Sequence, residues 1–333
     1  MKYRDLSIDA LKAIAIFMVV YGHSIASFSG LEYQSLNMSI QKIIYLVHMP
    51  LFMFLSGMVS KRFLEETNIK DGVLRKIKQL LLPMFFWCLI SWLIKVSLNL
   101  TNLGTPIHAI KSLYGEIESG YWFIWSLFIC SLYTKLVLSI TRGKLWGAIC
   151  GLLVFYAIPL YDQMAIFHLD ETKFMLPFYF GGYVLSKHDW KQWLSKIWFF
   201  IAALIVFITC CVYVKPSMFI YLLNLDFWHN PFFYNYIHFL FLLIAGFAGI
   251  YCFFFISQKI SFEKSGLSYI SSLGQCTLGI YLIQGVLFNV LLKWNSIIIG
   301  NHLVWFLLSV LITLVCYIFV YIFKNTRILK YVV

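Results

Sequence analysis

Ten apolar runs of roughly membrane-spanning length dominate the sequence. They cover residues 10–29, 40–60, 80–99, 121–140, 145–161, 174–186, 196–214, 231–256, 271–292 and 303–323. A helix needs about 20 apolar residues to cross a bilayer, so runs of this length predict transmembrane helices. Charged residues make up only 12% of the chain, about half the fraction found in soluble proteins. We expect an all-α polytopic transmembrane helical bundle of about ten spans, forming a single domain over residues 1–333.

The basic residues favour one side of such a bundle. With the N-terminus in the cytoplasm, most of the 26 Lys and Arg residues fall in cytoplasmic segments and few in outer ones. The positive-inside rule therefore predicts that both termini are cytoplasmic. It also accounts for the net charge of +12 without a nucleic-acid partner. The sequence leaves the oligomeric state open.

Cysteine and histidine spacing indicates no metal site. All eight cysteines fall inside the predicted spans without paired metal-ligand spacing, so we interpret them as small apolar residues. The histidines are scattered and form no zinc or iron pattern. We expect neither a metal nor a permanently bound cofactor.

The first apolar run carries titratable residues at membrane depth, where they are costly and usually face a protein interior or polar cavity. Lys12 and His23 are eleven residues apart, so they share one helix face and lie roughly 16 Å apart along the axis. Asp9 lies one turn before Lys12 and can pair with it. The alternative is an N-terminal anchor with a snorkelling lysine and an incidental histidine.

A second histidine, His48, is expected at a depth comparable to that of His23. It either belongs to the same site or is a core histidine bonded to a neighbouring carbonyl. Pro50 would favour the second role, because proline opens a helix locally and frees backbone carbonyls.

The longest basic stretch is expected to be a cytoplasmic loop from Lys61 to Lys78. Arg75, Lys76 and Lys78 stand at its end, directly before the third apolar run. They either set the topology by contacting lipid phosphates or bind a phosphorylated cytosolic ligand.

Short motifs follow one another in order along most of the chain. They are Asp9-x-x-Lys12 with a basic-x10-His spacing to Gly22-His23, His48-Met-Pro-Leu-Phe-Met-Phe-Leu-Ser56-Gly57, Tyr121-Trp122-Phe-Ile-Trp-Ser-Leu-Phe128, Phe178-Tyr-Phe-Gly-Gly-Tyr183 and Leu273-Gly-Gln-Cys-Thr-Leu-Gly-Ile-Tyr-Leu-Ile-Gln284. Each motif alone is weak, but the ordered set is specific. It resembles the bacterial acyltransferase-3 family of integral membrane O-acyltransferases.

This resemblance implies transfer of an acyl group, usually acetyl, from cytosolic acyl-CoA to a hydroxyl of a cell-surface glycan or lipid-linked saccharide. The enzyme would be a multi-pass protein of the bacterial cytoplasmic membrane. His23 would act as general base, with Asp9 and His48 as further catalytic candidates. The phosphorylated donor would be bound by Lys12, Arg75, Lys76 and Lys78. Candidates for substrate or oxyanion contacts, by motif position only, are Ser56, Trp122, Tyr281 and Gln284. Trp122 has an alternative role in packing and interfacial anchoring.

Gln284 departs from the pattern of the family, whose late helix often ends Tyr-Leu-x-His. Glutamine cannot carry a proton at neutral pH, so proton transfer would depend mainly on His23. No G-x-S-x-G nucleophile motif is present in the sequence. Direct transfer within a ternary complex is therefore favoured over a covalent intermediate, with an acyl-histidine as the alternative.

Three other classes fit parts of the sequence. A transporter or flippase of a glycolipid or small solute would explain polar residues within spans and a sixth run interrupted by Pro177 and Gly181-Gly182, where we expect a kinked or broken helix. A glycan polymerase would need a larger outer loop than the one near residues 100–120. A catalytically silent relative is the third class.

Overall fold

The structure, a computed structural model, describes residues 5–28, 39–101, 104–158, 167–187, 196–215, 218, 232–260, 268–292, 301–326 and 329–333. Every regular element in these ranges is helical. In chain order the elements are α1 (Leu6–Phe28), α2 (Ser39–Val59), α3 (Lys61–Glu66), α4 (Ile69–Lys76), η2 (Ile77–Leu81), α5 (Leu82–Ser97), α6 (Pro106–Ser119), α7 (Trp122–Ile140), α8 (Leu145–Ala157), α9 (Leu169–Lys187), α11 (Ile197–Tyr213), α12 (Phe232–Lys259), α13 (Ser268–Gly274), α14 (Thr277–Leu292), α16 (His302–Asn325) and η5 (Leu329–Tyr331). The expected all-α bundle is confirmed.

Each of the ten apolar runs contains a helix. Six helices are long and apolar enough to cross a membrane: Leu6–Phe28, Ile40–Val59, Ile69–Ser97, Trp122–Ile140, Tyr236–Lys259 and His302–Asn325. Helices α8, α11 and α14 are apolar but shorter. Residues 29, 159–161 and 231 of the predicted runs lie outside the described residues. The sequence thus predicted where the helices are, and their lengths support a polytopic membrane protein.

The helix that contains the third predicted run begins earlier than that run. Helices α4, η2 and α5 form one continuous helix over Ile69–Ser97. Its middle part, η2, is a π-helix, in which the Leu82 N–H donates to the carbonyl of Ile77, five residues earlier. The expectation of a loop from Lys61 to Lys78 is wrong, because α3 and α4 occupy most of that stretch. Its basic residues therefore have fixed positions on a helix.

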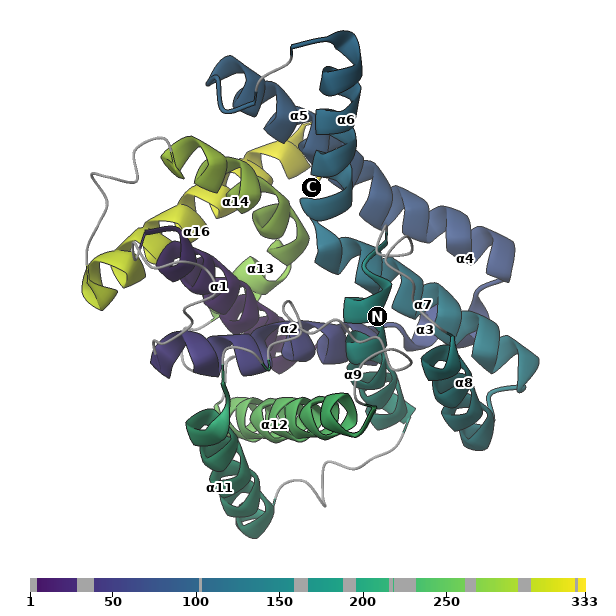
Figure 1. Cartoon of the computed structure of the whole chain (residues 1–333). Coiled ribbons are helices and arrows are strands. Elements are labelled where there is room, and N and C mark those ends of the chain that lie inside the picture. The colour runs from purple at the N-terminus through teal and green to yellow at the C-terminus, as the bar shows by residue number, and fades with distance from the viewer. Residues whose placement is uncertain are drawn as a thin grey trace.

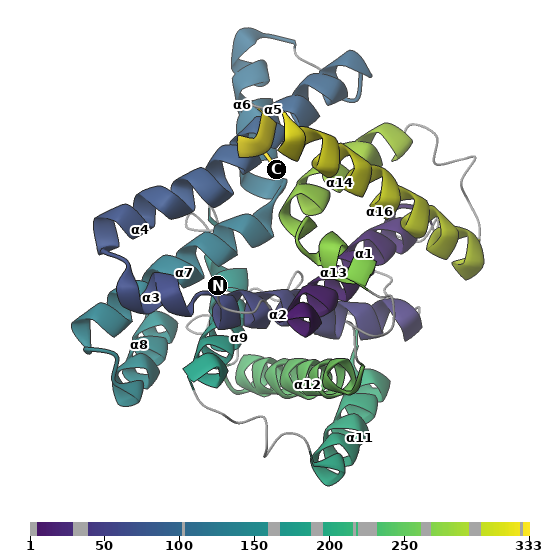
Figure 2. The ribbon, with the colours of Figure 1, turned by 180° about the vertical axis from the view of Figure 1, so that it is seen from behind.

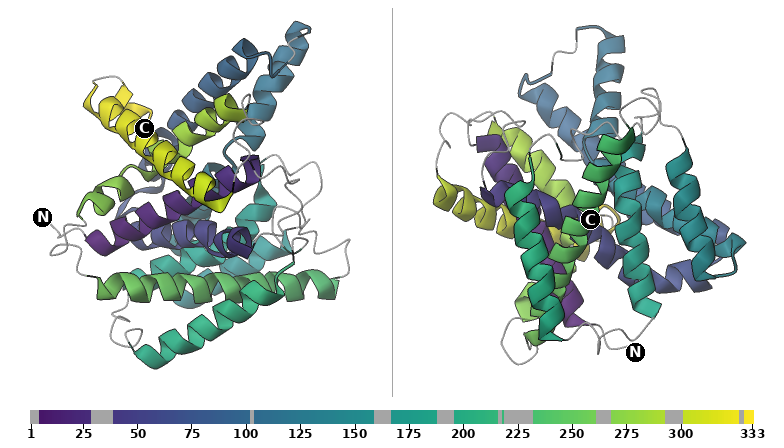
Figure 3. Two further views of the ribbon diagram at one scale, coloured as in Figure 1. Left: turned by 90° about the vertical axis from the view of Figure 1, so that its left-hand side faces the viewer. Right: turned by 60° about the horizontal axis from the view of Figure 1, so that its bottom comes forward.

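Helices α1 and α2 lie at the centre of the bundle (Figure 1). Helices α13, α14 and α16 pack around α1, and α9 packs along α2 (Figures 1 and 2). Figure 3 shows α1, α2, α12 and α11 stacked in successive layers, and each of these neighbouring pairs is in contact. The two helices that carry His23 and His48 are thereby enclosed by the other helices.

Helices α2 and α9 pack with their backbones in contact at two glycines. A methyl group on Gly57 would lie 1.9 Å from the carbonyl oxygen of Tyr179, and one on Gly182 would lie 1.9 Å from that of Phe54. Small residues allow such backbone contact between membrane helices, with Cα–H groups facing carbonyl oxygens. Of the two outcomes expected for the sixth run, a kinked or a broken helix, the break is wrong, because α9 is continuous through Pro177. Its glycines serve packing instead.

Two buried lysines donate hydrogen bonds to backbone carbonyls at the ends of helices. The Lys135 ammonium donates to the carbonyls of Leu64, at 3.0 Å, and Thr67, at the end of α3. The Lys173 ammonium donates to the carbonyls of Ile158, at 2.5 Å, and Tyr156, at 3.4 Å, at the end of α8. The last carbonyls of a helix have no partner within it, so these lysines provide the missing donors. Both have a structural role.

Helix α6 is held against the bundle by polar contacts. The Glu116 carboxylate accepts from the Lys95 ammonium at 2.6 Å and from the Ser91 hydroxyl at 2.5 Å, and Asn289 donates to that hydroxyl at 2.8 Å. These contacts join α5, α6 and α14. The stretch near residues 100–120 is therefore a docked helix over most of its length.

His168 joins α6 to the beginning of α9. Its Nε2 lies 2.6 Å from the Glu118 carbonyl and its Nδ1 lies 3.1 Å from the Glu171 carboxylate. Burial disfavours the charged imidazole, but the hydrogen bond to Glu171 outweighs it and raises the pKa of His168. Burial, followed by the neighbouring Glu171 carboxylate, raises the pKa of Asp170. This junction is therefore favoured when His168 is protonated.

We expect Gly57→Ala to destabilise the protein by about 1–3 kcal/mol, because its methyl group would collide with the Tyr179 carbonyl. Thermal unfolding in detergent measures this change. The matched control is Gly115→Ala on α6, where an added methyl group meets no atom within 4 Å; it should leave stability unchanged or raise it slightly. Equal melting temperatures for the two variants would contradict the close crossing.

His168→Ala should lower the melting temperature more at about pH 6 than at about pH 8.5. A raised pKa in the folded state gives stabilisation that is fully present below about 6.5, the pKa of an unfolded histidine, and is lost as the pH rises through the folded value. Thermal unfolding at the two pH values checks this. His108→Ala on α6 is the control, because His108 is exposed and its ring bonds to Thr105, three residues earlier. A pH-independent difference between wild type and His168→Ala would exclude a charged His168.

Candidate active site

His23 lies near the C-terminal end of α1, on the side that faces α14. Its ring centroid is 5.8 Å from that of Phe288. The His23 residue is nevertheless exposed, whereas its neighbours Gly22 and Ser24 are buried. A ring that contacts another helix of the bundle and is still accessible borders open space. His23 is therefore available to a substrate.

His48 lies on the buried face of α2. Its Nδ1 is 2.6 Å from the carbonyl of Ile44, one turn earlier, and its ring packs against Tyr45. In the neutral ring Nδ1 then carries the proton and Nε2 keeps its lone pair. A methyl group on Gly22, next to His23, would lie 3.2 Å from the ring of Tyr45, which packs against His48. The structure thus brings together the two histidines that the sequence singled out, and His48 also makes the neighbouring carbonyl bond expected of a core histidine.

Helix α14 presents one face to this region. Tyr281, Gln284 and Phe288 share that face, because they are spaced three and four residues apart. Phe288 contacts His23, and the Tyr281 ring lies 5.8 Å from that of Tyr121. Gln284 lies between them and is buried, and its Oε1 has no hydrogen-bond partner among the described residues. A buried amide oxygen without a donor is costly, so a hydroxyl or water beside it would be stabilised.

Aromatic contacts close the region on its other sides. Phe52, one turn after His48 on α2, lies 6.0 Å from Phe123 on α7, and Phe123 lies 6.0 Å from Tyr281. Helices α1, α2, α7 and α14 therefore surround a common centre. We call His23, His48, Tyr281 and Gln284 the central site.

A second feature, the basic pocket, lies at the beginning of α14. It has a volume of about 760 Å³, and its lining includes Asp71, Arg75, Lys78, Leu278 and Tyr331. Arg75 and Lys78 are exposed, so their charges are accessible. Leu278 and Gln284 lie six residues apart on α14, about 9 Å along the helix axis. The pocket and the central site are thus linked by a single helix.

The remaining basic candidates have different environments. Lys76 lies over the ring of Phe63, with its ammonium 4.8 Å from the ring centroid, and is not part of the pocket lining. Lys12 is half-buried on α1. The structure therefore brings Arg75 and Lys78 together and places Lys76 apart from them.

The other candidates lie around these two features. Asp9 is buried, and its backbone carbonyl is so close to Gly274 at the end of α13 that a methyl group there would lie 1.8 Å away. Ser56 is half-buried on α2, where its carbonyl accepts a hydrogen bond from the Ser60 hydroxyl. Trp122 is half-buried, with its ring next to that of Phe123. Of these contacts, the one between Asp9 and Gly274 joins two helices, α1 and α13.

Sequence reasoning missed Tyr121 and Tyr331. The Tyr121 hydroxyl donates to the carbonyl of Leu282 at 2.7 Å and its ring packs on Tyr281, so it fixes the middle of α14. Tyr331 lines the basic pocket, and beside it the Trp87 indole donates to the Val332 carbonyl at 2.7 Å. Tyr121 stood within a motif that drew attention to Trp122. Tyr331 carried no local signal.

Among the residues that the structure describes, no group of three or more His, Cys, Asp or Glu side chains is arranged to hold a metal ion. The central site instead offers two imidazoles, a phenol and an amide. These groups can accept and donate protons and hydrogen bonds to a reacting substrate.

The chain is similar in sequence to known proteins. Nodulation protein NolL of Mesorhizobium japonicum is 30% identical over 217 residues, which are 62% of this chain and 56% of that protein. Nodulation protein NolL of Sinorhizobium fredii is 28% identical over 185 residues, which are 55% of this chain and 49% of that protein. The chain spans about half the length of these curated relatives. No solved structure matches it.

A family model described as an acyltransferase domain matches residues 5–321, from the beginning of α1 almost to the end of α16. The match includes every residue of the central site, together with Arg75 and Lys78. The chain therefore belongs to the acyltransferase-3 family.

Proposed function

We propose that this protein is a membrane O-acyltransferase of the bacterial cytoplasmic membrane. It moves an acyl group, most simply acetyl, from cytosolic acyl-CoA to a hydroxyl of a cell-surface or lipid-linked glycan. The single observation that carries the proposal is that the exposed His23 lies on α1 next to the Tyr45–His48 pair of α2, in a centre that α14 links to the basic pocket. The family membership supports the reaction class.

His23 is the general base in this proposal. Its neutral imidazole takes the proton of the acceptor hydroxyl while the hydroxyl oxygen attacks the thioester carbonyl. The tetrahedral intermediate then collapses, and the C–S bond breaks. The proton returns from the imidazolium to the departing thiolate. The products are the glycan ester and free CoA, so no other reactant is needed.

The polar groups of α14 hold the reacting atoms. The unpaired Oε1 of Gln284 accepts a hydrogen bond from the acceptor hydroxyl, which orients that hydroxyl before proton transfer. The Tyr281 hydroxyl is a candidate donor to the oxyanion that forms on the thioester carbon. His48 supports His23 from the buried side of the site.

The donor binds with its phosphates at the basic pocket. Arg75 and Lys78 supply two accessible cations, and such groups bind phosphates by charge-assisted hydrogen bonds. An extended pantetheine arm then follows α14 towards the central site. Lys12, which precedes His23 by eleven residues on α1, adds positive charge along the path of the pantetheine arm. This arrangement requires the basic end of the bundle to face the cytosol.

Replacing His23 tests the base. His23→Ala should lower turnover of acetyl-CoA by about 10²- to 10⁴-fold, the range for loss of a general base. Release of CoA by the purified protein, with and without a glycan acceptor, is the measurement. His108→Ala is the control, since His108 is an exposed histidine of α6. A fully active His23→Ala protein would refute the assignment.

Replacing the pocket cations tests donor binding. Arg75→Ala and Lys78→Ala should each raise the KM for acetyl-CoA about tenfold or more, because each removes a charge-assisted hydrogen bond to phosphate. Steady-state kinetics with acetyl-CoA and with acetyl-pantetheine, which carries no phosphate, separates this effect from misfolding, since the KM for the analogue should change little. Arg62→Ala is the control, because Arg62 is exposed and paired with Glu66 on α3. Equal losses with both donors would contradict a phosphate role.

A further inference from the structure

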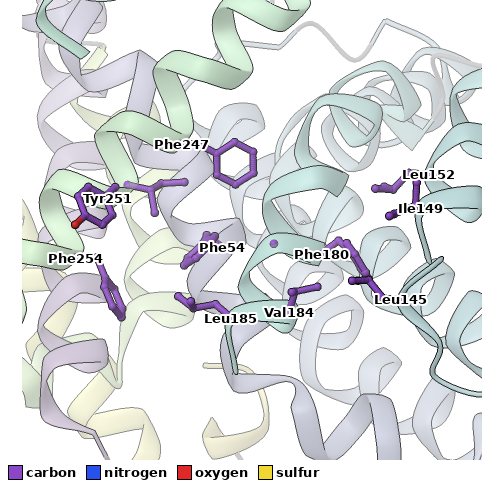
Figure 4. Close-up of a pocket in the computed structure, with 12 residues that line it drawn as sticks. Phe54, Leu145, Ile149, Leu152, Phe180, Val184, Leu185, Phe247, Tyr251 and Phe254 are labelled. Atoms are coloured by element: carbon purple, nitrogen blue, oxygen red, sulfur yellow. The ribbon is translucent and has the colours of Figure 1, made fainter. Parts of the chain in front are cut away.

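An apolar groove lies on the side of the bundle, away from the central-site residues. It has a volume of about 500 Å³ and lies among α2, α8, α9 and α12. Its lining is apolar almost throughout and includes Phe54, Ile149, Leu152, Phe180, Phe247 and Phe254. Figure 4 shows side chains of α8 on one side, those of α12 on the other, and Phe54, Phe180 and Val184 between them. This volume is in the range of ligand-binding pockets.

The groove is bordered by exposed apolar side chains of α8. Leu145 is 52% exposed and Ile149 is 50% exposed, although both line the groove. Helix α12 contains a candidate membrane-spanning segment, and α8 is a shorter apolar helix. Exposed leucine and isoleucine on such helices face lipid tails, so a hydrocarbon chain can enter the groove from the side without crossing water.

One end of the groove is basic. At the beginning of α8, Leu145 follows Lys144 directly and Arg142 by three residues, and Leu185 lies two residues before Lys187 at the end of α9. Lys259 ends α12, with its ammonium 5.4 Å from the centroid of the Phe255 ring. Lys187 is paired with Glu65 at 3.2 Å. Three further basic residues therefore stand at the same end of helices that line the groove.

We infer that this groove binds an anionic phospholipid. The lipid comes from the membrane leaflet that lies next to the basic end of the groove. An acyl chain fills the apolar groove, and the phosphate lies among Arg142, Lys144 and Lys259. Basic residues beside a pocket between membrane helices are a recurrent arrangement for anionic headgroups. The inference does not depend on acyl transfer, because none of these residues belongs to the central site or the basic pocket.

Lipid binding to the purified protein tests the inference. The protein in mild detergent is titrated with phosphatidylglycerol and with phosphatidylcholine of identical acyl chains, and bound lipid is counted by native mass spectrometry. Phosphatidylglycerol should bind more tightly. Ile149→Trp should reduce binding by filling the groove, and Lys144→Gln should weaken phosphatidylglycerol binding about fivefold by removing one charge near the phosphate.

Two matched controls share the local structure. Leu153→Trp places the same ring on α8 at a residue that is 64% exposed and outside the groove lining. Lys196→Gln removes a lysine that precedes α11 as Lys144 precedes α8. Both should bind phosphatidylglycerol as the wild type does. Equal binding of the two lipids by the wild type, equal effects of the two tryptophans, or a dimer that buries Ile149 would each overturn the inference.

Discussion

The backbone contact between α2 and α9 determines where the candidate active site lies. Gly57 and Gly182 let the two helices approach until carbonyl oxygens touch glycine Cα atoms. His48 and Phe52 are on α2, within three turns of Gly57, so the position of α2 sets the position of both rings. Phe52 then contacts Phe123 on α7, which contacts Tyr281 on α14. A series of contacts that begins at the glycine crossing of α2 and α9 thus holds the site in position.

The sequence predicted the helices well because a bilayer imposes a simple demand. Each spanning segment must satisfy its own backbone hydrogen bonds and be apolar along its length, and both properties show in local composition. The predictions failed where the local residue composition suggests the end of a helix but the helix continues. Arg75 and Lys78 look like loop residues by charge, yet they belong to a helix that continues into α5. Pro177 suggests a break, yet α9 tolerates it within a packed bundle.

The site was predictable only in part. The helix spacing of Lys12 and His23 and the depth of His48 are local properties, so the sequence could indicate them. Tyr331 could not be found in this way, because it reaches the basic pocket through contacts between distant parts of the chain. The Trp87–Val332 hydrogen bond beside it joins residues 245 positions apart. The unpaired Oε1 of Gln284 is also a product of tertiary packing, since it depends on which neighbours fail to supply a donor.

The π-helical turn η2 has a consequence for how the two ends of its helix are oriented. A π-turn holds one residue more than an α-turn, so it rotates the helical segment before it by about 100° relative to the segment after it. Arg75 lies before this turn and Leu80 and Pro83, which also line the basic pocket, lie within and after it. A relative with one residue fewer between Lys76 and Leu82 could keep α5 packed as it is and still turn Arg75 to another side. The number of residues in this turn therefore sets the direction in which Arg75 points relative to α5, whichever residues the turn contains.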